Sequence, residues 1–212
     1  MIKALTKVFP GVQIRGCRFH FCQAIWRKIQ EVPVLRQKYG HDLIYTENLK
    51  MIMSLAFVPP EKVRTCYDEL CASKFFEDHS QEMDKFLMYF EKAWIGRNLG
   101  GRRKKALYDI ALWNCYHREL ESAPLTTNAI EAWHRGFNSL VQASHPTIWK
   151  LIDALKKDDA VNILKRHQIN AGLDTKKNTY NDKHANILRV VQRCDSLEPL
   201  VYLKSIATNL KV

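Results

Sequence analysis

The sequence lacks the features typical of secreted and membrane-spanning proteins. Its six cysteines include no C-x-x-C pair and do not have the spacing of a small disulfide framework. No N-terminal stretch resembles a signal peptide, because "MIKALTKVFP" is short, amphipathic and ends at a Pro-Gly turn. The longest apolar stretch, "MIMSLAFVPP", is far shorter than the roughly 20 residues that span a bilayer. We therefore expect an intracellular protein in a reducing compartment, without a membrane partner.

Acidic residues are also few. The chain of 212 residues contains 22 Asp and Glu against 33 Lys and Arg, which gives a formal net charge of +11. A surplus of this size indicates a polyanionic partner, nucleic acid before an acidic membrane surface, although the charge can also serve solubility alone. Because 46% of the residues are hydrophobic, the chain can bury a core and disorder is not expected.

Helical periodicity dominates what is present. Apolar residues recur at helical spacing in most segments, and Pro-Gly, Pro-Pro and Gly-Gly pairs interrupt them. The pattern predicts a mainly α fold, with one helix over residues 19–38 and a helical tail over 171–212. Only residues 12–16, "VQIRG", alternate like a strand. A lone strand leaves its backbone groups unpaired, so either it is not a strand or its partners lie outside this sequence, and we favour the second interpretation.

A dense run of basic residues surrounds Gly100-Gly101. Its members are Arg97, Arg102, Arg103, Lys104 and Lys105. In an exposed loop such groups suit phosphate contacts, and an ordinary solvated loop is the alternative. The Gly-Gly pair is not a phosphate-binding fingerprint, because no strand precedes it and no Walker spacing follows. Trp94 lies just before the loop, where core packing is the favoured interpretation and stacking on an unpaired base is the other.

Cysteine and histidine residues allow a weak zinc hypothesis. Cys17 and His20 form a C-x-x-H motif, but a structural zinc site needs four ligands, usually from two spaced clusters. The second cluster would be Cys115 and His117, whose one-residue gap is tight for tetrahedral ligation. A buried cysteine with a capping or core histidine is the simpler interpretation.

The stretch "TTNAIEAWHRGFN", residues 126–138, predicts the start of a helix. Asn128 and Glu131 have the spacing of a capping box, in which the glutamate reaches back to the cap amide. The buried stripe would consist of Ile130, Trp133, Phe137, Leu140 and Val141. Glu131, His134 and Arg135 lie together on the neighbouring face. They could hold a metal or a phosphodiester, although an ordinary solvated face explains them equally well.

Three stretches together resemble the transposases of Mutator-like elements. They are "FPGVQIRGCRFHFCQAIWRKIQ", then "LAFVPPEKVRTCYDEL" with "YFEKAWIG", and "IALWNCYHRELESAPLTTNAIEAWHRGFNSLV". The first contains the family's C-x-x-H motif, here Cys17 and His20, and the last contains its T-N-x-x-E-x-W-H pattern, here with Glu131. The resemblance extends from Met1 to about residue 170.

The resemblance implies a ribonuclease-H-like core interrupted by an all-helical insertion. Its active site would hold two Mg²⁺ ions on two Asp and one Glu, because strand cleavage and joining use one metal for the attacking oxygen and another for the leaving one. Glu131 would be the triad glutamate, and His20 would lie near the active site. The insertion would handle transposon-end DNA in the nucleus, in DNA transposition and recombination.

This sequence departs from the family pattern at both catalytic aspartates. The two positions precede the helix with which this chain begins, and Asp42 and Asp68 fall within the insertion. One carboxylate cannot hold two metals, so we expect a truncated, catalytically inactive core with no Mg²⁺ at the catalytic site, and zinc is not expected either. The chain would divide into a core remnant over 1–38, a helical insertion over 39–124, core helices over 125–170 and the tail over 171–212. Homo-oligomer formation stays open.

The resemblance predicts two further Asp codons in the coding DNA upstream of Met1, one on a strand and one just before the first helix. Sequencing that region checks the expectation. Unrelated upstream DNA, with a long native transcript starting at Met1, would instead favour a non-catalytic helical nucleic-acid-binding module.

Overall fold

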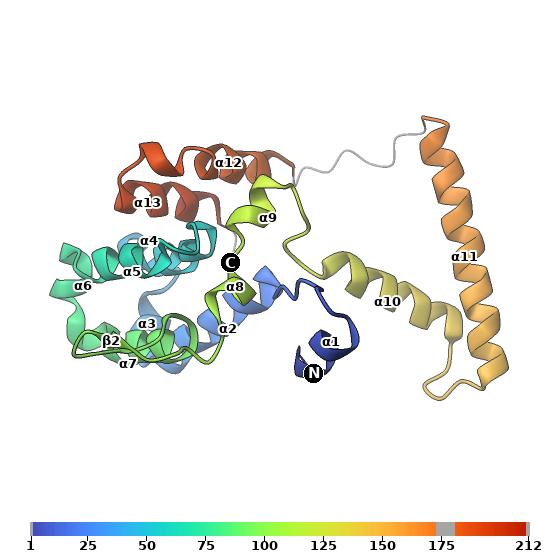
Figure 1. Ribbon diagram of the computed structural model, residues 1–212, viewed down its shortest axis with the longest axis horizontal. Coiled ribbons are helices and arrows are strands. Elements are labelled where there is room, and N and C mark those ends of the chain that lie inside the picture. The colour runs from blue at the N-terminus through green and yellow to red at the C-terminus, as the bar shows by residue number, and fades with distance from the viewer. Residues whose placement is uncertain (1, 173–180, 211–212) are drawn as a thin grey trace. The chain divides into compact units, whose positions relative to one another are not determined.

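The computed structural model describes residues 2–172 and 181–210, and the chain divides into two compact units. The larger unit is formed by Met1–Leu125 with Asp182–Val212, and the smaller one by Thr126–Asn181. Both consist of helices (Figure 1), and the strands of the described part are two pieces of two residues each, β1 (Asn98–Leu99) and β2 (Arg102–Arg103). The prediction of a mainly α fold is confirmed.

The larger unit contains most of the helices. Its first half consists of α1 (Ile2–Val8), α2 (Arg18–Glu31), α3 (Pro33–Lys38), α4 (Leu43–Ser54), η1 (Leu55–Phe57), α5 (Val63–Cys71), α6 (Lys74–Asp78) and α7 (Ser80–Phe90). Then follow the π-helical turn η2 (Glu91–Ile95), the hairpin β1–β2, α8 (Ile110–Trp113), α9 (Tyr116–Leu120), α12 (Asn181–Val191), η3 (Cys194–Ser196) and α13 (Pro199–Asn209). The predicted core remnant and the predicted insertion thus pack within one unit.

Helix α4 lies at the centre of this unit. It begins at the cap residue Asp42, whose carboxylate accepts hydrogen bonds from the amides of Ile44 (2.9 Å) and Tyr45 (3.2 Å). Leu49 and Ile52 are completely buried, and burial is uninterrupted from Met51 of α4 through Phe57 of η1. A stretch that is buried on every side must be covered on every side by other elements.

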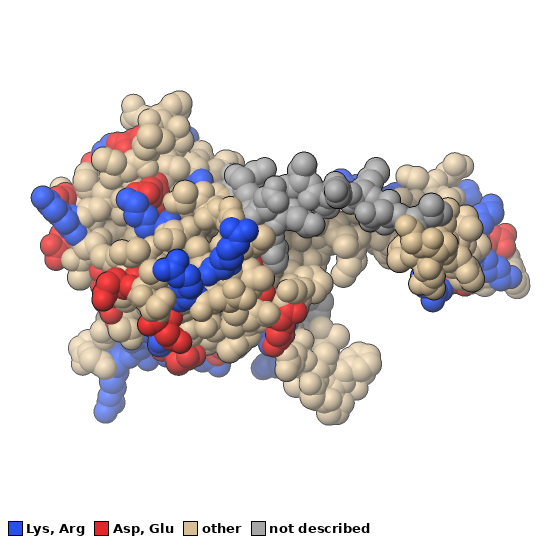
Figure 2. Space-filling model, turned by 90° about the horizontal axis from the view of Figure 1, so that it is seen from above, with Lys and Arg blue, Asp and Glu red and all other residues tan. Residues whose placement is uncertain are grey.

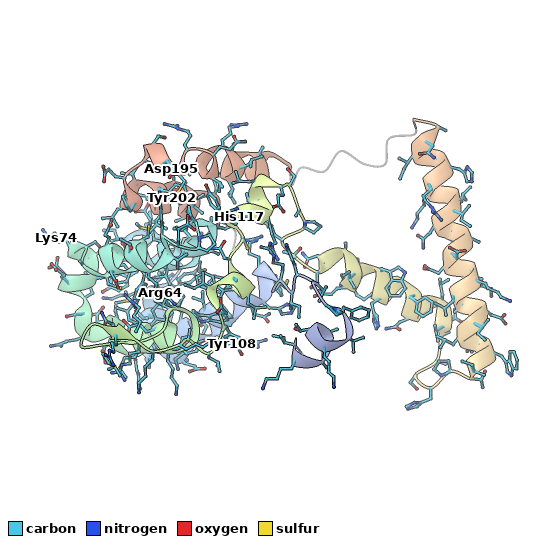
Figure 3. All side chains as sticks on the ribbon, viewed as in Figure 1. Arg64, Lys74, Tyr108, His117, Asp195 and Tyr202 are labelled. Carbon is cyan, nitrogen blue, oxygen red and sulfur yellow. The ribbon has the colours of Figure 1, made fainter. Side chains whose placement is uncertain are left out.

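The C-terminal helix α13 supplies part of that cover. It packs along α4 and against α5, and Leu203 and Ile206 on it are fully buried. The buried hydroxyl of Tyr202 donates a hydrogen bond to the carbonyl oxygen of Phe57 in η1 (Figure 3). The Nζ of Lys50 donates to the carbonyl oxygen of Leu210 at 3.1 Å. The described part of the tail is therefore built into the core of the larger unit.

The prediction of a strand over residues 12–16 is wrong. Residues 12–17 lie outside every helix and strand that the structure describes. The amide of Gly16 donates to the carbonyl oxygen of Leu112 (2.6 Å), and the carbonyl oxygen of Gly16 accepts from Nη1 of Arg118 (2.7 Å). A helix residue and an arginine side chain, not a neighbouring strand, thus satisfy the backbone at Gly16.

The helix predicted over residues 19–38 is interrupted. Helix α2 ends at Glu31, and Pro33 begins α3 at its first position. Proline lacks the amide hydrogen that an uninterrupted helix would need there, but it suits the first turn of a new helix. Phe21, Ile25 and Ile29 of α2 face the core as the pattern predicts.

The smaller unit is a pair of helices, α10 (Asn128–Val141) and α11 (Ile148–Asn170). They pack around Phe137, Val141 and Ala154, near the turn that joins them. The predicted stripe on α10 is only partly buried, since Ile130, Trp133 and Leu140 are exposed, Ile130 by 64%. The contact with α11 in this unit covers only the end of the stripe.

No helix within residues 2–172 and 181–210 is both long enough and apolar enough to span a membrane. The longest, α11, carries charged residues through its middle in "KKDD", residues 156–159.

A polar cluster of Lys38, Tyr45 and Glu82 connects α3, α4 and α7. The Nζ of Lys38 donates hydrogen bonds to the hydroxyl of Tyr45 (2.7 Å) and to Oε2 of Glu82 (3.1 Å), and the Tyr45 hydroxyl donates to the same carboxylate. The hydrogen bond from Tyr45, followed by that from Lys38, lowers the pKa of Glu82 below its ordinary value of 4.5. The ionised carboxylate is therefore the form that the fold stabilises.

We predict that Glu82→Gln destabilises the protein at pH 7 and that this difference shrinks under acid. Because the pKa of Glu82 is lowered in the folded state, its stabilisation is complete above the ordinary value of 4.5 and is lost as the pH falls through the lower folded value. Urea unfolding at pH 7 and in the acid range measures both differences. Glu77→Gln, at an exposed carboxylate nearby, is the matched control, and an equal loss for Glu82→Gln at both pH values would contradict the prediction.

Candidate nucleic-acid interface

The basic run forms a short hairpin in the larger unit. Asn98 pairs with Arg103 and Leu99 with Arg102 in antiparallel register. Gly100 and Gly101 form the turn with φ of 59° and 88°, the positive values that a two-residue type I′ turn requires. The predicted loop is thus an ordered turn, and the Gly-Gly pair between basic residues was the signal for a hairpin.

The base of the hairpin leaves no room for a side chain at Gly96. This residue ends η2 with φ of 90°, and a Cβ built there would overlap the carbonyl oxygen of Lys104. The amide of Lys104 donates to the carbonyl oxygen of Arg97 at 2.8 Å and extends the pairing below the strands. Close backbone approach at a glycine therefore sets where the hairpin leaves the helix.

Arg103 differs from the other basic residues of the run. Its guanidinium binds the carboxylate of Asp68 on α5, and its Nη1 donates to the carbonyl oxygen of Gly96 at 3.1 Å. Only 16% of its side chain is exposed, so Arg103 anchors the hairpin and is not available to a ligand. The exposed members of the run are Arg97, Arg102, Lys104 and Lys105.

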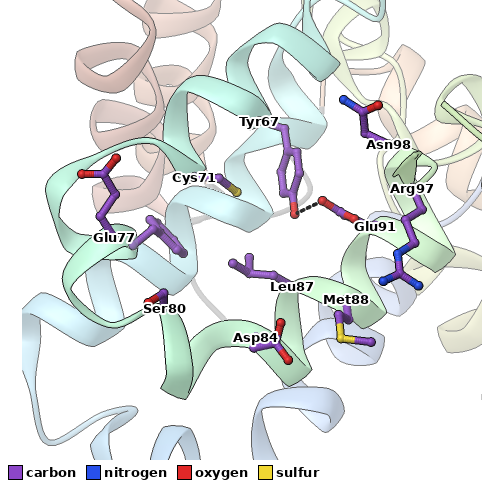
Figure 4. A pocket seen from close by; sticks show the side chains of 11 residues that line it. Tyr67, Cys71, Glu77, Ser80, Asp84, Leu87, Met88, Glu91, Arg97 and Asn98 are labelled. Atoms are coloured by element: carbon purple, nitrogen blue, oxygen red, sulfur yellow. Dashed lines mark hydrogen bonds between the residues drawn. The ribbon is translucent and has the colours of Figure 1, made fainter. Parts of the chain in front are cut away.

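A pocket of about 460 Å³ lies beside the base of the hairpin, between α5, α6 and α7 (Figure 4). Its carboxylates belong to Glu77, Asp84 and Glu91, and Arg97 is the one basic residue that lines it. The hydroxyl of the buried Tyr67 donates to Oε1 of Glu91 at 3.4 Å, and burial raises the pKa of Tyr67. Because carboxylates repel phosphate, this side disfavours nucleic acid, and Arg102, Lys104 and Lys105 remain as the phosphate-facing group.

Trp94 belongs to the core, as the favoured interpretation had it. The residue is 7% exposed, so its ring is not available to a base. Its outer face is covered by Tyr108, whose ring is stacked on it with the centroids 4.7 Å apart and the planes at 26°. Tyr108 is 41% exposed and lies three residues after the basic run (Figure 3). Sequence reasoning missed it, although the aromatic residue in "KKALY" was a usable signal.

Basic and acidic side chains are interspersed on part of the surface of the larger unit. On the face seen in Figure 2, Lys and Arg side chains alternate with Asp and Glu side chains, and no large patch of a single sign appears. Opposite charges at such spacing cancel at distances beyond about 8–10 Å at physiological salt. The exposed cations that follow the hairpin turn are therefore a stronger candidate for a polyanion contact than the mixed charges of this face.

Glu131 lies in the first turn of helix α10, but the cap differs from the predicted one. The cap is Thr127, and Asn128 is already the first helical residue. The hydroxyl of Thr127 donates to Oε1 of Glu131 at 2.9 Å. A shallow pocket of about 460 Å³ is lined by Ile130, Glu131, His134 and Arg135. It therefore contains a single carboxylate beside an imidazole and a guanidinium.

The predicted metal ligands do not assemble into a recognisable site. Within the described ranges, no group of three or more His, Cys, Asp or Glu side chains is arranged to hold a metal ion. His20 is an exposed residue of α2, where its ring packs edge-on against that of Phe19, and Cys17 is the residue before that helix. The Mg²⁺ pair implied by the family resemblance does not fit the one carboxylate at Glu131, and no chemistry follows from it.

The geometry does not favour the zinc alternative. Cys115 is buried, and Nη2 of Arg118 lies 3.5 Å from its Sγ. Burial raises the pKa of the Cys115 thiol, which disfavours the thiolate that a metal binds. His117 lies at an exposed position on α9 (Figure 3), whereas Cys115 is buried, so the pairing that the zinc alternative would need is not seen.

Glu119, beside Arg118 on α9, is the carboxylate most changed by its surroundings. It is completely buried, and this burial raises its pKa to about 7, against the opposing charge of Arg18. Perturbed carboxylates are common at functional sites. Because Glu119 does not reach solvent, it is not accessible to a ligand in this structure.

Comparisons with protein-family models, with curated proteins and with solved structures found no match to this chain. The candidate interface therefore rests on its own geometry. That geometry consists of a paired hairpin, three exposed cations and an exposed tyrosine whose ring stacks on Trp94.

We predict that Arg103→Ala destabilises the larger unit by about 1–2 kcal/mol, because it removes the pair with Asp68 and a hydrogen bond to the backbone. Arg102→Ala removes the same charge one position away, at an exposed site, and should change stability by less than about 0.5 kcal/mol. Urea unfolding of both variants measures the contrast. Equal effects would show that Arg103 does not anchor the hairpin.

Proposed function

We propose that this chain is the helical C-terminal part of the catalytic domain of a Mutator-like transposase and that it binds DNA through the hairpin. The observation that carries the proposal is the exposure of Arg102, Lys104 and Lys105 on a hairpin that Arg103 anchors to Asp68. Guanidinium and ammonium groups held on a fixed backbone bind successive phosphates with little loss of conformational freedom. A DNA partner also makes the nucleus the compartment in a eukaryotic cell.

The family assignment is supported by the order of its motifs. The C-x-x-H motif at Cys17, the helical middle and the Glu131 pattern follow one another along the chain as in the family. The exposed apolar residues of α10, Ile130, Trp133 and Leu140, fit helices that pack on a further layer in a complete ribonuclease-H-like core. We propose that such a layer is what these residues contact in an intact family member.

Within this proposal the chain does not catalyse strand transfer. Glu131 is its one member of the expected triad, and its hydrogen bond from Thr127 gives it a structural role at the start of α10. Mg²⁺ would be needed by an intact transposase, whereas phosphate contacts by the hairpin need no cofactor. The function retained is DNA binding related to transposition.

A second candidate is a non-catalytic helical module that binds nucleic acid independently of any transposase. The observation that favours it is the closed core of the larger unit, in which α13 covers α4 and the Tyr202 hydroxyl binds η1. A unit with its own core can fold and bind without a further domain. Both candidates use the same hairpin, so binding tests the shared part.

We predict salt-dependent DNA binding that depends on the hairpin. The logarithm of affinity should fall with the logarithm of salt concentration, and replacing Arg102, Lys104 and Lys105 together by Gln should reduce the slope by about 2–3, because each phosphate contact contributes about 0.9. Fluorescence anisotropy with a labelled duplex between about 50 and 200 mM salt measures this.

The matched control replaces Lys156, Lys157 and Lys165 of α11, which are exposed, by Gln. It removes the same charge from the smaller unit and should leave most of the slope. A flat slope for the wild-type protein would contradict the DNA-binding proposal. Equal slopes for the two triple variants would show that the hairpin cations contribute only through the net charge and do not form a specific binding site.

A further inference from the structure

Four aromatic rings form a continuous series from the core to the surface beside the hairpin. The rings of Phe21 and Trp113 are stacked with centroids 4.8 Å apart, Phe21 meets Trp94 edge-on at 5.0 Å, and Trp94 stacks on Tyr108 at 4.7 Å. The three inner residues are buried, and Tyr108 is exposed. The outermost ring therefore has one face on tryptophan and one side toward solvent.

Tyr108 is also fixed through its backbone. Its amide donates to the carbonyl oxygen of Ala93 at 2.9 Å, and the amide of Leu107 donates to that of Lys92 at 3.1 Å. Two successive hydrogen bonds to η2 hold this segment in place, and the indole of Trp94 sets the tilt of the ring. A ring ordered before binding loses little conformational freedom when a second ring stacks on it.

The cations of the hairpin precede this ring on the same stretch of chain. Lys104 and Lys105 are exposed, and Lys105 lies three residues before Tyr108, so their Cα atoms are at most about 11 Å apart. The ammonium group at the end of a lysine side chain can also move several ångströms from its Cα, so it adds to this reach. A phosphate held by the cations and a base held by the ring can therefore belong to one short stretch of a strand.

We propose that Tyr108 is a stacking platform for an unpaired nucleobase, which makes single-stranded or locally opened DNA the preferred ligand of the hairpin. This inference rests on the proposed DNA binding and specifies its substrate class. Every base presents a π-face to an aromatic ring when it is unpaired, whereas in a duplex both faces already stack on neighbouring bases. The cations supply affinity for any strand, and the ring adds affinity only where a base is free.

The test measures affinity for a single-stranded oligonucleotide and for the duplex of the same length and sequence. Tyr108→Ala should weaken binding to the single strand by about 5- to 150-fold, the range expected for one base on one aromatic ring, and change duplex binding by less than about twofold. Tyr108→Phe keeps the ring and should retain the wild-type preference. Leu107→Ala, which removes an exposed apolar side chain next door, should alter neither affinity.

A second readout reports stacking directly. With one 2-aminopurine in the single strand, the wild-type protein and Tyr108→Phe should change its fluorescence on binding, and Tyr108→Ala should not. Near-UV circular dichroism and thermal unfolding check that the variants are folded.

The outcomes separate this inference from the proposed function. Salt-dependent binding in which Tyr108→Ala weakens single strand and duplex equally, or neither, overturns the stacking role and leaves DNA binding intact. Absence of any salt-dependent binding by the wild-type protein overturns the proposed function and this inference with it.

Discussion

The larger unit depends on the burial of one helix. Because residues 51–57, the end of α4 and all of η1, are buried without interruption, neighbours in the sequence are not enough to cover them. Helix α13 completes the cover, and the hydroxyl of Tyr202 binds the one carbonyl oxygen of η1, at Phe57, that an apolar neighbour would leave unsatisfied. The positions of α5 and of the hairpin anchored to it by Arg103 follow from this arrangement.

Position on a rigid scaffold divides a uniform run of basic residues into three roles. Arg103 turns back onto Asp68, Arg97 lines an acidic pocket, and the cations after the turn face solvent. Composition alone treats these side chains as equivalent. Their different surroundings explain how a short hairpin can combine an internal anchor with exposed cations, next to the exposed ring of Tyr108.

The periodicity of apolar residues was sufficient to predict local secondary structure, which depends on neighbours in the chain. It was insufficient to predict contacts between distant segments. The mainly α fold follows from apolar spacing, and Gly100-Gly101 was readable as a turn. The alternation at residues 12–16 suggested a strand, but the backbone of Gly16 instead pairs with Leu112 and with a side chain from α9. The exposure of Tyr108 could not be read either, because it depends on which face of Trp94 the core leaves uncovered.

The pairing of α4 with α13 also has a consequence in time. Helix α4 ends at Ser54 and α13 begins at Pro199, so a ribosome makes the whole stretch between them before α13 can cover the apolar side of α4. Contacts of this sequence separation close slowly, and exposed apolar surface in the meantime favours association with other chains. Nascent chains of this protein are therefore expected to be substrates for holding chaperones until α13 leaves the ribosome.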